Sequence, residues 1–361
     1  MPLHYTSYKN TEPLQIKISG QNDHLNEAAG LVSVGFSARD GLINCVAVKL
    51  TSTRDGNSAF YVRSRNIMHR IQQKLSKNER KYLIEMFDAG YTTPYGEGAL
   101  IMELGEESFA ERLYGRRRTV QYKSGSDLLG AISELAQPLV EFHKIHMDVN
   151  PRNYLYVLDN GRTVLKLIDF EGAQYISSSN PNESVVVGVH AFTPEYTGPE
   201  YYDPLYGQIS TKFDIWSVGM IAFELFVDRL RAERGERPMN DTERRTTLCN
   251  IGNLYLGFKR NRFGDFPGAV KEVLISYAED RNWVWQNSDA INTVLQLWLK
   301  FPKTALLVTN LLHFQQEKRL TAQGILDYIN VLLKKVLKVQ QREIYEMEAS
   351  VAMEFEECEA E

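Results

Sequence analysis

The sequence predicts an α+β protein of two lobes, a small antiparallel β-sheet lobe with one helix and a larger, mainly helical lobe. Three patterns indicate this. Residues 30–50 alternate apolar and polar side chains between glycines, as half-buried hairpin strands do. Apolar residues then recur at helical spacing at Ile67, Met68 and Ile71. From about Ser126 onward, long amphipathic patterns dominate, so the second lobe is expected to be helical.

Composition limits the classes of partner. The chain has 361 residues, 43% of them hydrophobic, which is enough for one large domain or two lobes with real cores. A net charge of -5 gives no electrostatic reason to expect nucleic acid. Three widely spaced cysteines fit neither a disulfide framework nor a zinc site, and no stretch resembles a signal peptide or a membrane span. We expect a cytoplasmic protein, in its own cell or inside a host cell, with no membrane partner.

The small lobe is expected at residues 25–105, after an N-terminal extension at residues 1–24. A turn at residues 39–41 joins the two hairpin strands. The helix follows, and then strand-like runs at residues 82–87 and 99–104.

The large lobe is expected at residues 106–338, with helices in residues 128–145, 215–226 and 305–312. An enlarged region at about 227–310 carries additional tryptophans, and it could form a docking surface for a partner or simply extra core. The glutamate-rich segment 339–361 predicts disorder or a frayed helix, and an acidic segment that binds a partner or inhibits the protein is the alternative.

The candidate site begins with Asp148 in a polar loop. Asn153 follows five residues later, and Asp169 ends a strand-like run at residues 163–168. In-line phosphoryl transfer needs an acceptor for the proton of the substrate hydroxyl, and it needs hard oxygen ligands for Mg²⁺. Asp148 would be the acceptor, whereas Asn153 and Asp169 would bind the metal. Taken alone, the same pattern fits a polar loop between two buried strands equally well.

Other motifs in the right order decide between these interpretations. With them the chain resembles the eukaryotic-type protein kinase family over roughly residues 25–335. The motifs are the apolar strand 45–50 that contains Lys49, the segment His146 to Asn153, Ile168-Asp169-Phe170, the segment 192–200 that ends in Gly198-Pro199-Glu200, Asp214-Ile215-Trp216-Ser217-Val218-Gly219 and the late Arg319.

The resemblance implies ATP and Mg²⁺ as cofactors and a protein as substrate. By this resemblance Lys49 reaches the α- and β-phosphates, Met102 is the gatekeeper, and the backbone of residues 103–105 holds the adenine. The expected ATP-binding residues are Ala47, Lys49, Met102, Glu103, Leu104, Gly30, Val32, Asn153, Leu155 and Asp169. It also implies that the ring of His146 packs on Phe170, and that Glu200 and Arg319 form a buried ion pair.

Several positions depart from the family. Residues 56–78 contain no acid, so the glutamate that usually holds the lysine from the following helix is missing, and Asn66, Gln72 or Gln73 could replace it. Met147 replaces an arginine that meets a phosphorylated loop, which suggests activity without loop phosphorylation. Glu171 replaces a glycine and is expected to restrict the loop or to add charge near the metal. Of the glycine-rich phosphate flap, only Gly30 remains.

Two residues bear on the choice of substrate. Asn150 stands where serine/threonine kinases carry a lysine, and Arg152, four residues after Asp148, stands where many tyrosine kinases carry an arginine; it could supply the missing charge. Thr193 belongs to a segment of serine/threonine type and is expected to contact Asp148 and the substrate hydroxyl. We weigh Thr193 more, and the predicted catalytic residues are Asp148, Lys49, Arg152 and Thr193.

The leading hypothesis is therefore a Mg·ATP-dependent kinase for protein serine or threonine hydroxyls. The alternative from another class is a pseudokinase that binds nucleotide or acts as a scaffold, in view of the missing helix glutamate, Asn150, Glu171 and the poor flap. A tyrosine kinase or a small-molecule kinase is a further alternative, and Gly198-Pro199-Glu200 and the helix that carries Asp214 argue against the latter.

Overall fold

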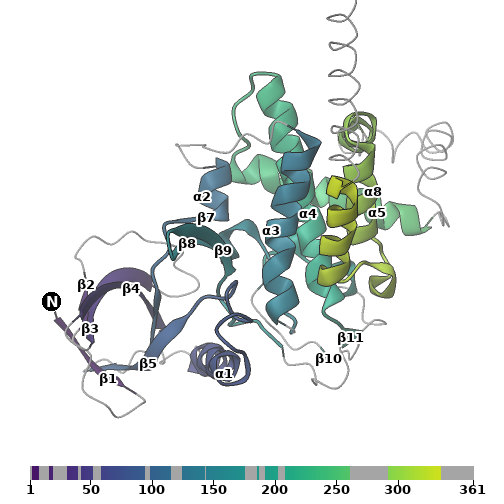
Figure 1. Cartoon of the computed structure of the whole chain (residues 1–361). Coiled ribbons are helices and arrows are strands. Elements are labelled where there is room, and N and C mark those ends of the chain that lie inside the picture. Colours follow the sequence, from purple (N-terminus) through teal and green to yellow (C-terminus); the bar gives the residue numbers. More distant parts are fainter. Residues whose placement is uncertain are drawn as a thin grey trace, which may run out of the picture.

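The computed structural model combines an antiparallel β-barrel, a small second sheet and a group of helices (Figure 1). It describes residues 2–7, 16–18, 31–39, 42–51, 58–93, 98–114, 124–142, 144–174, 185–186, 192–201, 208–260 and 292–334. The barrel lies on one side of the molecule, α3, α4, α5 and α8 lie on the other, and β8 and β9 lie between them. The predicted α+β fold of two lobes is confirmed.

The barrel closes in the order β1-β2-β3-β4-β6-β5, and every neighbouring pair is antiparallel. Arg39 pairs with Leu42, so two residues join β3 and β4, as the predicted hairpin requires. β1 and β2 fall within residues 1–24, which we expected to precede the small lobe; in the structure they pair with β5 and β3. The strands are β1 Pro2–Ser7, β2 Ile16–Ile18, β3 Leu31–Arg39, β4 Leu42–Thr51, β5 Met86–Thr93 and β6 Gly98–Glu103.

The prediction of a strand at residues 82–87 is wrong, because β5 begins only at Met86. The apolar residues before it have another role. Leu167 donates its backbone N–H to Tyr82 and accepts one from Ile84, which attaches this segment to the end of β9. The side chains of Leu83 and Ile84 are buried in the main core. An apolar run thus forms a connection between the two sheets rather than a strand of the barrel.

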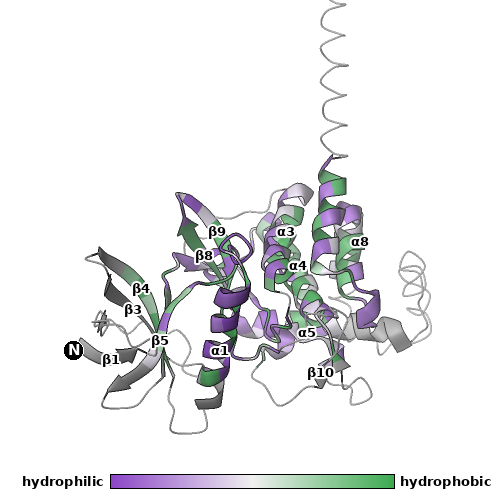
Figure 2. Ribbon diagram, turned by 60° about the horizontal axis from the view of Figure 1, so that its bottom comes forward, coloured by the Kyte–Doolittle hydropathy of each residue, from purple (hydrophilic) through white to green (hydrophobic). Residues whose placement is uncertain are grey.

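Helix α1, Ser58–Lys74, is the expected helix of the small lobe. Its residues Ile67, Met68 and Ile71 are buried, as their spacing predicts. Tyr61 also faces inward, and its hydroxyl donates to the carbonyl of Gly90 in β5 over 2.7 Å. The remaining surface of the helix is largely hydrophilic (Figure 2). One face of α1 therefore ties the helix to the barrel.

A second sheet leads into the candidate site. It consists of β7 Glu107–Ser108, β8 Tyr154–Asp159 and β9 Arg162–Leu167 in the order β7-β8-β9. Asn160 and Gly161 join β8 to β9 and have positive φ angles of 51° and 77°. An Asn-Gly pair is suited to such a two-residue turn, since both central residues must adopt the left-handed conformation. The hairpin places Asn153 just before β8 and Asp169 just after β9.

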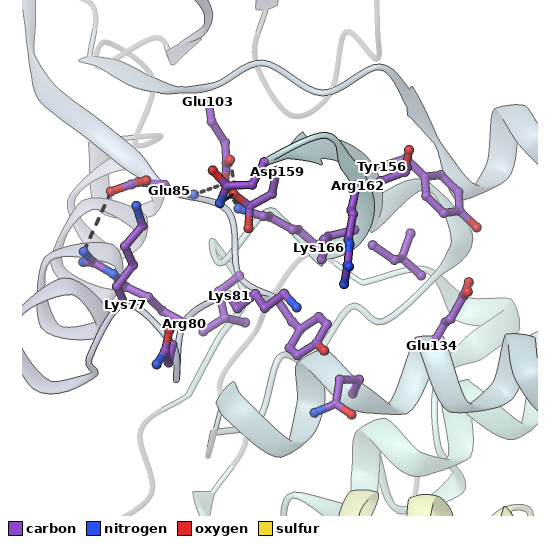
Figure 3. Close-up of a pocket in the computed structure, with 18 of the residues that line it drawn as sticks. Lys77, Arg80, Lys81, Glu85, Glu103, Glu134, Tyr156, Asp159, Arg162 and Lys166 are labelled. Carbon is purple, nitrogen blue, oxygen red and sulfur yellow. Dashed lines mark hydrogen bonds and ion pairs between the residues drawn. The ribbon is translucent and has the colours of Figure 1, made fainter.

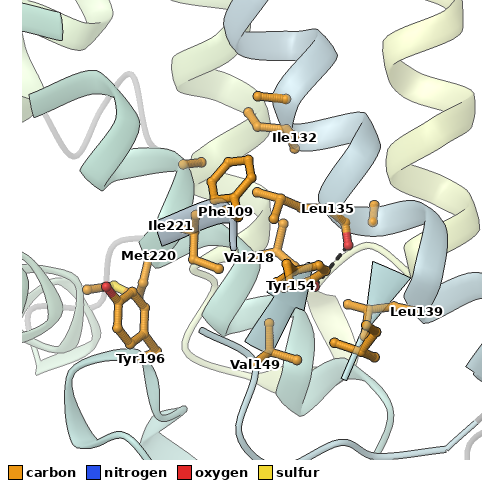
Figure 4. Close-up of a cluster of buried hydrophobic side chains, with 14 of the residues drawn as sticks. Phe109, Ile132, Leu135, Leu139, Val149, Tyr154, Tyr196, Val218, Met220 and Ile221 are labelled. Atoms are coloured by element: carbon orange, nitrogen blue, oxygen red, sulfur yellow. Dashed lines mark hydrogen bonds between the residues drawn. The ribbon is translucent and has the colours of Figure 1, made fainter. Parts of the chain in front are cut away.

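The helices surround α4, Lys212–Glu233, which is buried on nearly all sides. A helix that is apolar all round belongs in a core. Figure 4 shows part of that core, where side chains of α3 and α4 meet Phe109, Val149 and Tyr154. The other helices are α2 Phe109–Tyr114, α3 Gly125–Phe142, α5 Asp241–Arg260 and α8 Pro302–Leu311, and residues 292–300 and 322–334 are also helical. The helices predicted within residues 128–145, 215–226 and 305–312 are present as α3, α4 and α8, although α3 ends at Phe142 and α8 at Leu311.

Short elements complete the large lobe: η1 Pro151–Asn153, β10 Val185–Val186, η2 Pro194–Tyr196, η3 Pro199–Tyr201, β11 Gln208–Ile209 and η4 Gln316–Lys318. The glutamate-rich segment 339–361 and residues 261–291 of the enlarged region lie outside the described residues. Within the described part of the chain, none of the helices is long and apolar enough to cross a membrane.

The expected ion pair between Arg319 and Glu200 is present and buried. Both guanidinium Nη atoms bind the two carboxylate oxygens, at 2.6 and 2.8 Å. Three backbone carbonyls accept the remaining N–H groups, among them those of His313 at 2.7 Å and Lys212 at 3.0 Å. A buried charge is tolerated when it is paired and fully hydrogen-bonded. This pair joins η3 to the segment after α8.

Replacing Arg319 with methionine is expected to lower the free energy of unfolding by about 3–5 kcal/mol, because Glu200 would remain buried without its cation. Denaturant unfolding followed by tryptophan fluorescence measures the change. Arg237→Met is the matched control, since the Arg237–Glu243 pair is exposed and should contribute about 1 kcal/mol or less. Equal unfolding midpoints for the two variants would contradict the prediction.

Candidate active site

Asp214, at the start of α4, fixes the loop that carries Asp148. The Asp214 carboxylate accepts the backbone N–H groups of His146, at 2.6 Å, and Met147, at 3.0 Å. Met147 has a φ of 75°, a conformation that costs free energy for a residue other than glycine. The two bonds to a buried carboxylate hold the loop in this shape, although burial raises the pKa of Asp214 to about 7.

His146 connects this loop to the segment of Asp169. Its ring lies edge-on to Phe170, with ring centroids 5.7 Å apart, and Phe170 stacks on Phe142. The expected packing of His146 on Phe170 is therefore present. His146 Nε2 lies 2.8 Å from the carbonyl oxygen of Ile168, and burial lowers the pKa of the ring. A neutral imidazole that donates from Nε2 fits these contacts.

Asp148 and Thr193 are in direct contact. One carboxylate oxygen of Asp148 accepts both the backbone N–H of Thr193, at 2.8 Å, and its hydroxyl, at 2.7 Å. Asn150 donates its amide Nδ2 to the Thr193 hydroxyl over 3.1 Å. The segment before η2 is thus fixed against the loop that carries Asp148. Asn150 serves as a bridge within the site, with its Oδ1 capping η1 through the N–H of Arg152.

Asn153 completes the contacts of Asp148. Its Nδ2 donates to the Asp148 backbone carbonyl at 2.8 Å and to the carboxylate at 3.0 Å. The backbone carbonyl of Asn153 accepts the N–H of Ile168 at 2.9 Å, which brings the end of β9 beside η1. The three residues predicted for phosphoryl transfer, Asp148, Asn153 and Asp169, therefore come from two adjacent segments of the structure.

Lys49 of β4 lies between two carboxylates of the Asp169 loop. Its Nζ is 2.9 Å from Asp169 Oδ1 and 2.7 Å from Glu171 Oε1, and the lysine side chain is only 8% exposed. Helix α1 supplies neither of these partners. Among the described residues, the polar contacts of Lys49 Nζ are the Asp169 and Glu171 carboxylates, so the suggestion that Gln72 would replace the missing helix glutamate is wrong. Gln72 Nε2 instead donates to the carbonyl of Met86.

Asn66 does not fill that role either, since its Oδ1 accepts from Arg65. The acid missing from α1 is thus replaced from a different segment. The sequence signal was Glu171 itself, two residues after Asp169, where the family has glycine. Its proximity to Lys49 depends on the folded loop and could not be derived from spacing.

The charges of this cluster act on one another. Burial alone would lower the pKa of Lys49, but the Asp169 and Glu171 carboxylates outweigh it and raise that pKa to about 12. Burial would raise the pKa of Asp169, and Lys49 overcomes this and lowers it. The pKa of Glu171 is raised by burial and by the adjacent Asp169 charge. Lys49 is accordingly a fixed cation at neutral pH, and Asp169 is the stronger of the two acids.

The donor set fits a hard cation. Asn153 uses its amide nitrogen toward Asp148, so its carbonyl oxygen lies on the opposite side of the amide group. Asp169 carries a lowered pKa and stays ionised. Carboxylate and amide oxygens are the ligands that Mg²⁺ prefers. Asn153 and Asp169 are therefore chemically suited to the metal that the sequence predicts.

Several residues expected to bind ATP lie on adjacent strands of the barrel or just after β6. Ala47 pairs with Met102, and Lys49 pairs with Val32 across β3 and β4. A Cβ on Gly105 would lie 2.2 Å from Leu155 Cγ, so the Leu155 side chain lies directly against the backbone that follows Glu103 and Leu104. Gly30 lies outside the described residues.

Glu103 has a second, structural role. Its carboxylate accepts two bonds from Lys166 Nζ, at 2.7 and 2.9 Å, and one from the backbone N–H of Glu85. These bonds turn its side chain toward β9. Glu103 would therefore bind nucleotide only through its backbone groups.

Arg152 lies in η1, and its side chain is 53% exposed. Its guanidinium is 3.7 Å from Asp241 at the start of α5. The same end of α5 makes two more ion pairs, from Arg244 to the buried Glu224 at 2.9 Å and from Arg245 to Glu195 at 2.7 Å. The start of α5 is thereby bound to η1, to η2 and to α4.

A cavity of about 990 Å³ lies elsewhere, between the linker after α1, α3 and the β8–β9 hairpin. Its described lining is polar and includes neither Lys49 nor Asp148, Asn153 or Asp169. Figure 3 shows Lys77, Lys81 and Arg162 on its walls beside the Lys166–Glu103 pair. This cavity is therefore not the site of the predicted chemistry.

Comparison with known proteins identifies the family of the chain. A family model for the protein kinase domain matches residues 29–329. Serine/threonine-protein kinase 17A of Oryctolagus cuniculus is 23% identical over 60% of this chain and 52% of its own length. Myosin light chain kinase 2, skeletal/cardiac muscle, of Homo sapiens is 36% identical over 36% of this chain and 20% of its own length.

MAP kinase-activated protein kinase 2 of Homo sapiens is 30% identical over 35% of this chain and 27% of its own length. The chain thus spans about half or less of the length of these relatives.

A pH dependence follows from Glu224, whose carboxylate accepts from the Tyr196 hydroxyl at 2.8 Å. Burial raises the pKa of Glu224 from 4.5 to about 7. Between pH 4.5 and about pH 7, Glu224 is deprotonated in the unfolded chain but still protonated in the folded protein. This contribution to stability is therefore complete below pH 4.5 and is lost as the pH rises through about 7.

We expect Glu224→Gln to flatten the fall in the unfolding free energy between pH 5 and pH 7, by up to about 1.4 kcal/mol per pH unit. Denaturant titrations at several pH values measure the slope. Glu236→Gln, which removes an exposed carboxylate, is the control and should keep the slope of the unmodified protein. An unchanged slope in Glu224→Gln would refute the assignment.

Proposed function

The chain belongs to the protein kinase family, and we propose that it transfers the terminal phosphoryl group of Mg·ATP to serine or threonine hydroxyls of protein substrates. The observation that carries the proposal is the assembly of Lys49, Asp148, Asn153 and Asp169 at one place. They come from β4, from the loop before η1, from η1 itself and from the segment after β9. Hydrogen bonds of 2.8 to 3.0 Å link Lys49 to Asp169 and Asn153 to Asp148.

Each residue has a task that its contacts allow. Lys49 would bind the α- and β-phosphates from a rigid strand. Asn153 and Asp169 would hold Mg²⁺, which bridges phosphate oxygens and offsets their charge. Asp148 would accept the proton of the attacking hydroxyl, and because its carboxylate already binds Thr193, that oxygen acceptor is fixed in place. Positioning and charge, rather than covalent chemistry, would account for the rate.

The contact of Thr193 with Asp148 supports serine or threonine as the acceptor. The short reach of these hydroxyls suits a base held against the segment that would bind the peptide. The names of the three relatives include a serine/threonine-protein kinase, and this supports the same choice. A cytoplasmic location is part of the proposal. It rests on the cysteines, which are widely spaced and odd in number and so do not suggest a disulfide framework; Cys45 and Cys249 are free thiols.

A pseudokinase is the second candidate, favoured by one observation: Lys49, the residue expected to bind phosphate, is held by two carboxylates. If those ion pairs persisted, phosphate would have to compete for the ammonium. The presence of Asp148, Asn153 and Asp169 together favours transfer. Docking of a partner on the enlarged region of the large lobe stays a prediction.

The test is transfer from γ-labelled ATP to a mixture of serine, threonine and tyrosine peptides in Mg²⁺. We expect label on serine or threonine, a loss of about 10²–10⁴-fold in rate for Asp148→Asn, and no detectable transfer for Asp169→Ala. Glu236→Gln is the control and should keep the full rate. If transfer by the unmodified protein is no faster than transfer by Asp169→Ala, the proposed enzymatic activity is wrong. If the label appears only on tyrosine, the assignment of serine or threonine as the acceptor is wrong.

Arg152 is proposed to supply the positive charge that Asn150 lacks. Arg152→Gln should then reduce the rate of transfer by about tenfold with little change in the KM for ATP, whereas Arg152→Lys should retain most of it. The control is Asp241→Asn, which removes the ion-pair partner and leaves the guanidinium. Steady-state kinetics decide, and a normal rate for Arg152→Gln would show that the exposed arginine only pairs with α5.

A further inference from the structure

The ammonium group of Lys49 is buried, so it must have an anionic partner inside the protein. No acid occurs between Asp55 and Glu79, so α1 brings none. Asp169 is one partner, at 2.9 Å. The same carboxylate is the one proposed to hold Mg²⁺, and oxygen atoms committed to a divalent cation interact less with a lysine. A second acid is therefore needed while nucleotide is bound.

Resting on the proposed function, we propose that Glu171 is a positioning residue that holds the Lys49 ammonium toward the nucleotide phosphates while Asp169 binds the metal. Glu171 Oε1 lies 2.7 Å from Lys49 Nζ, and the glutamate side chain is 13% exposed. It performs from the metal loop the task that a helix glutamate performs in the family pattern. A glycine at this position would leave the lysine with Asp169 alone.

The shape of the loop explains how two carboxylates reach one lysine. Asp169 adopts a left-handed conformation with a φ of 64°. Between the two acids, Phe170 is fully buried and packs against His146 and Phe142. The N–H of Ala173 donates to the Phe170 carbonyl at 3.2 Å and closes the turn. Phe170 anchors the loop in the core, and Asp169 and Glu171 on either side of it both contact Lys49.

This arrangement separates the lysine from α1. Lys49 belongs to β4, and both of its acids belong to one short loop. Gln72, one of the candidates on α1, is committed to the carbonyl of Met86. Movement of α1 would then not break the contact between the lysine and its acid.

The test compares the binding of Mg·ATP and of adenosine to the full chain by calorimetry. Variants are Glu171→Gln, Lys49→Met and the double variant. We expect Glu171→Gln to weaken ATP binding by about tenfold and to leave adenosine binding unchanged, since adenosine has no phosphate for Lys49 to reach. In the Lys49→Met background, Glu171→Gln should have no further effect, because the glutamate acts through the lysine. Glu171→Asp should retain part of the affinity.

Glu236→Gln is the matched control for the loss of one carboxylate and should bind ATP normally. Unchanged ATP affinity in Glu171→Gln, or effects of the two substitutions that simply add, would overturn the inference. Coupling between the two residues in a chain that transfers no phosphate would uphold it and overturn the enzymatic function. Transfer without coupling would do the reverse, and a chain that does not bind ATP would overturn both.

Discussion

A buried charge must be paired, and this constraint holds the elements around the candidate site together. Arg319 and Glu200 join the segment after α8 to η3, and Lys166 joins β9 to Glu103 at the end of β6. Lys49 joins the barrel to the Asp169 loop. Removal of Arg319 would leave the Glu200 carboxylate buried without a cation, at a cost of several kcal/mol. The order of the chain places these residues far apart, so the ion pairs specify which segments meet.

Much of the fold could be predicted because its patterns are local. The β3–β4 hairpin and helices α1, α3, α4 and α8 follow from apolar periodicity, which depends only on neighbouring residues. The strand predicted at residues 82–87 failed for a non-local reason. Leu83 and Ile84 look like strand residues, but they pair with Leu167 and bury their side chains in the large core. Periodicity alone gives no information about which core an apolar segment enters.

The candidate site divides in the same way. Asp148, Asn153 and Asp169 could be found because their types and spacing carry the chemistry. The contact of Glu171 with Lys49 and the bond from Gln72 to Met86 could not be found, because a loop conformation with a positive φ at Asp169 decides the first and the packing of α1 on β5 decides the second. The positions that depart from the family pattern can be recognised in the sequence. The residues that they contact are seen only in the folded structure.

The ion pair between Lys49 and Glu171 also bears on how divergent chains are sorted. A rule that requires an acid at one fixed place in the alignment would class this chain as inert, since the helix lacks it. A rule that asks whether any carboxylate meets the lysine would class it with the functional members. The first rule asks which residue stands at one aligned position, whereas the second asks whether the lysine ammonium has an anionic partner. Only the second rule recognises a chain in which the acid that meets the lysine lies on another segment.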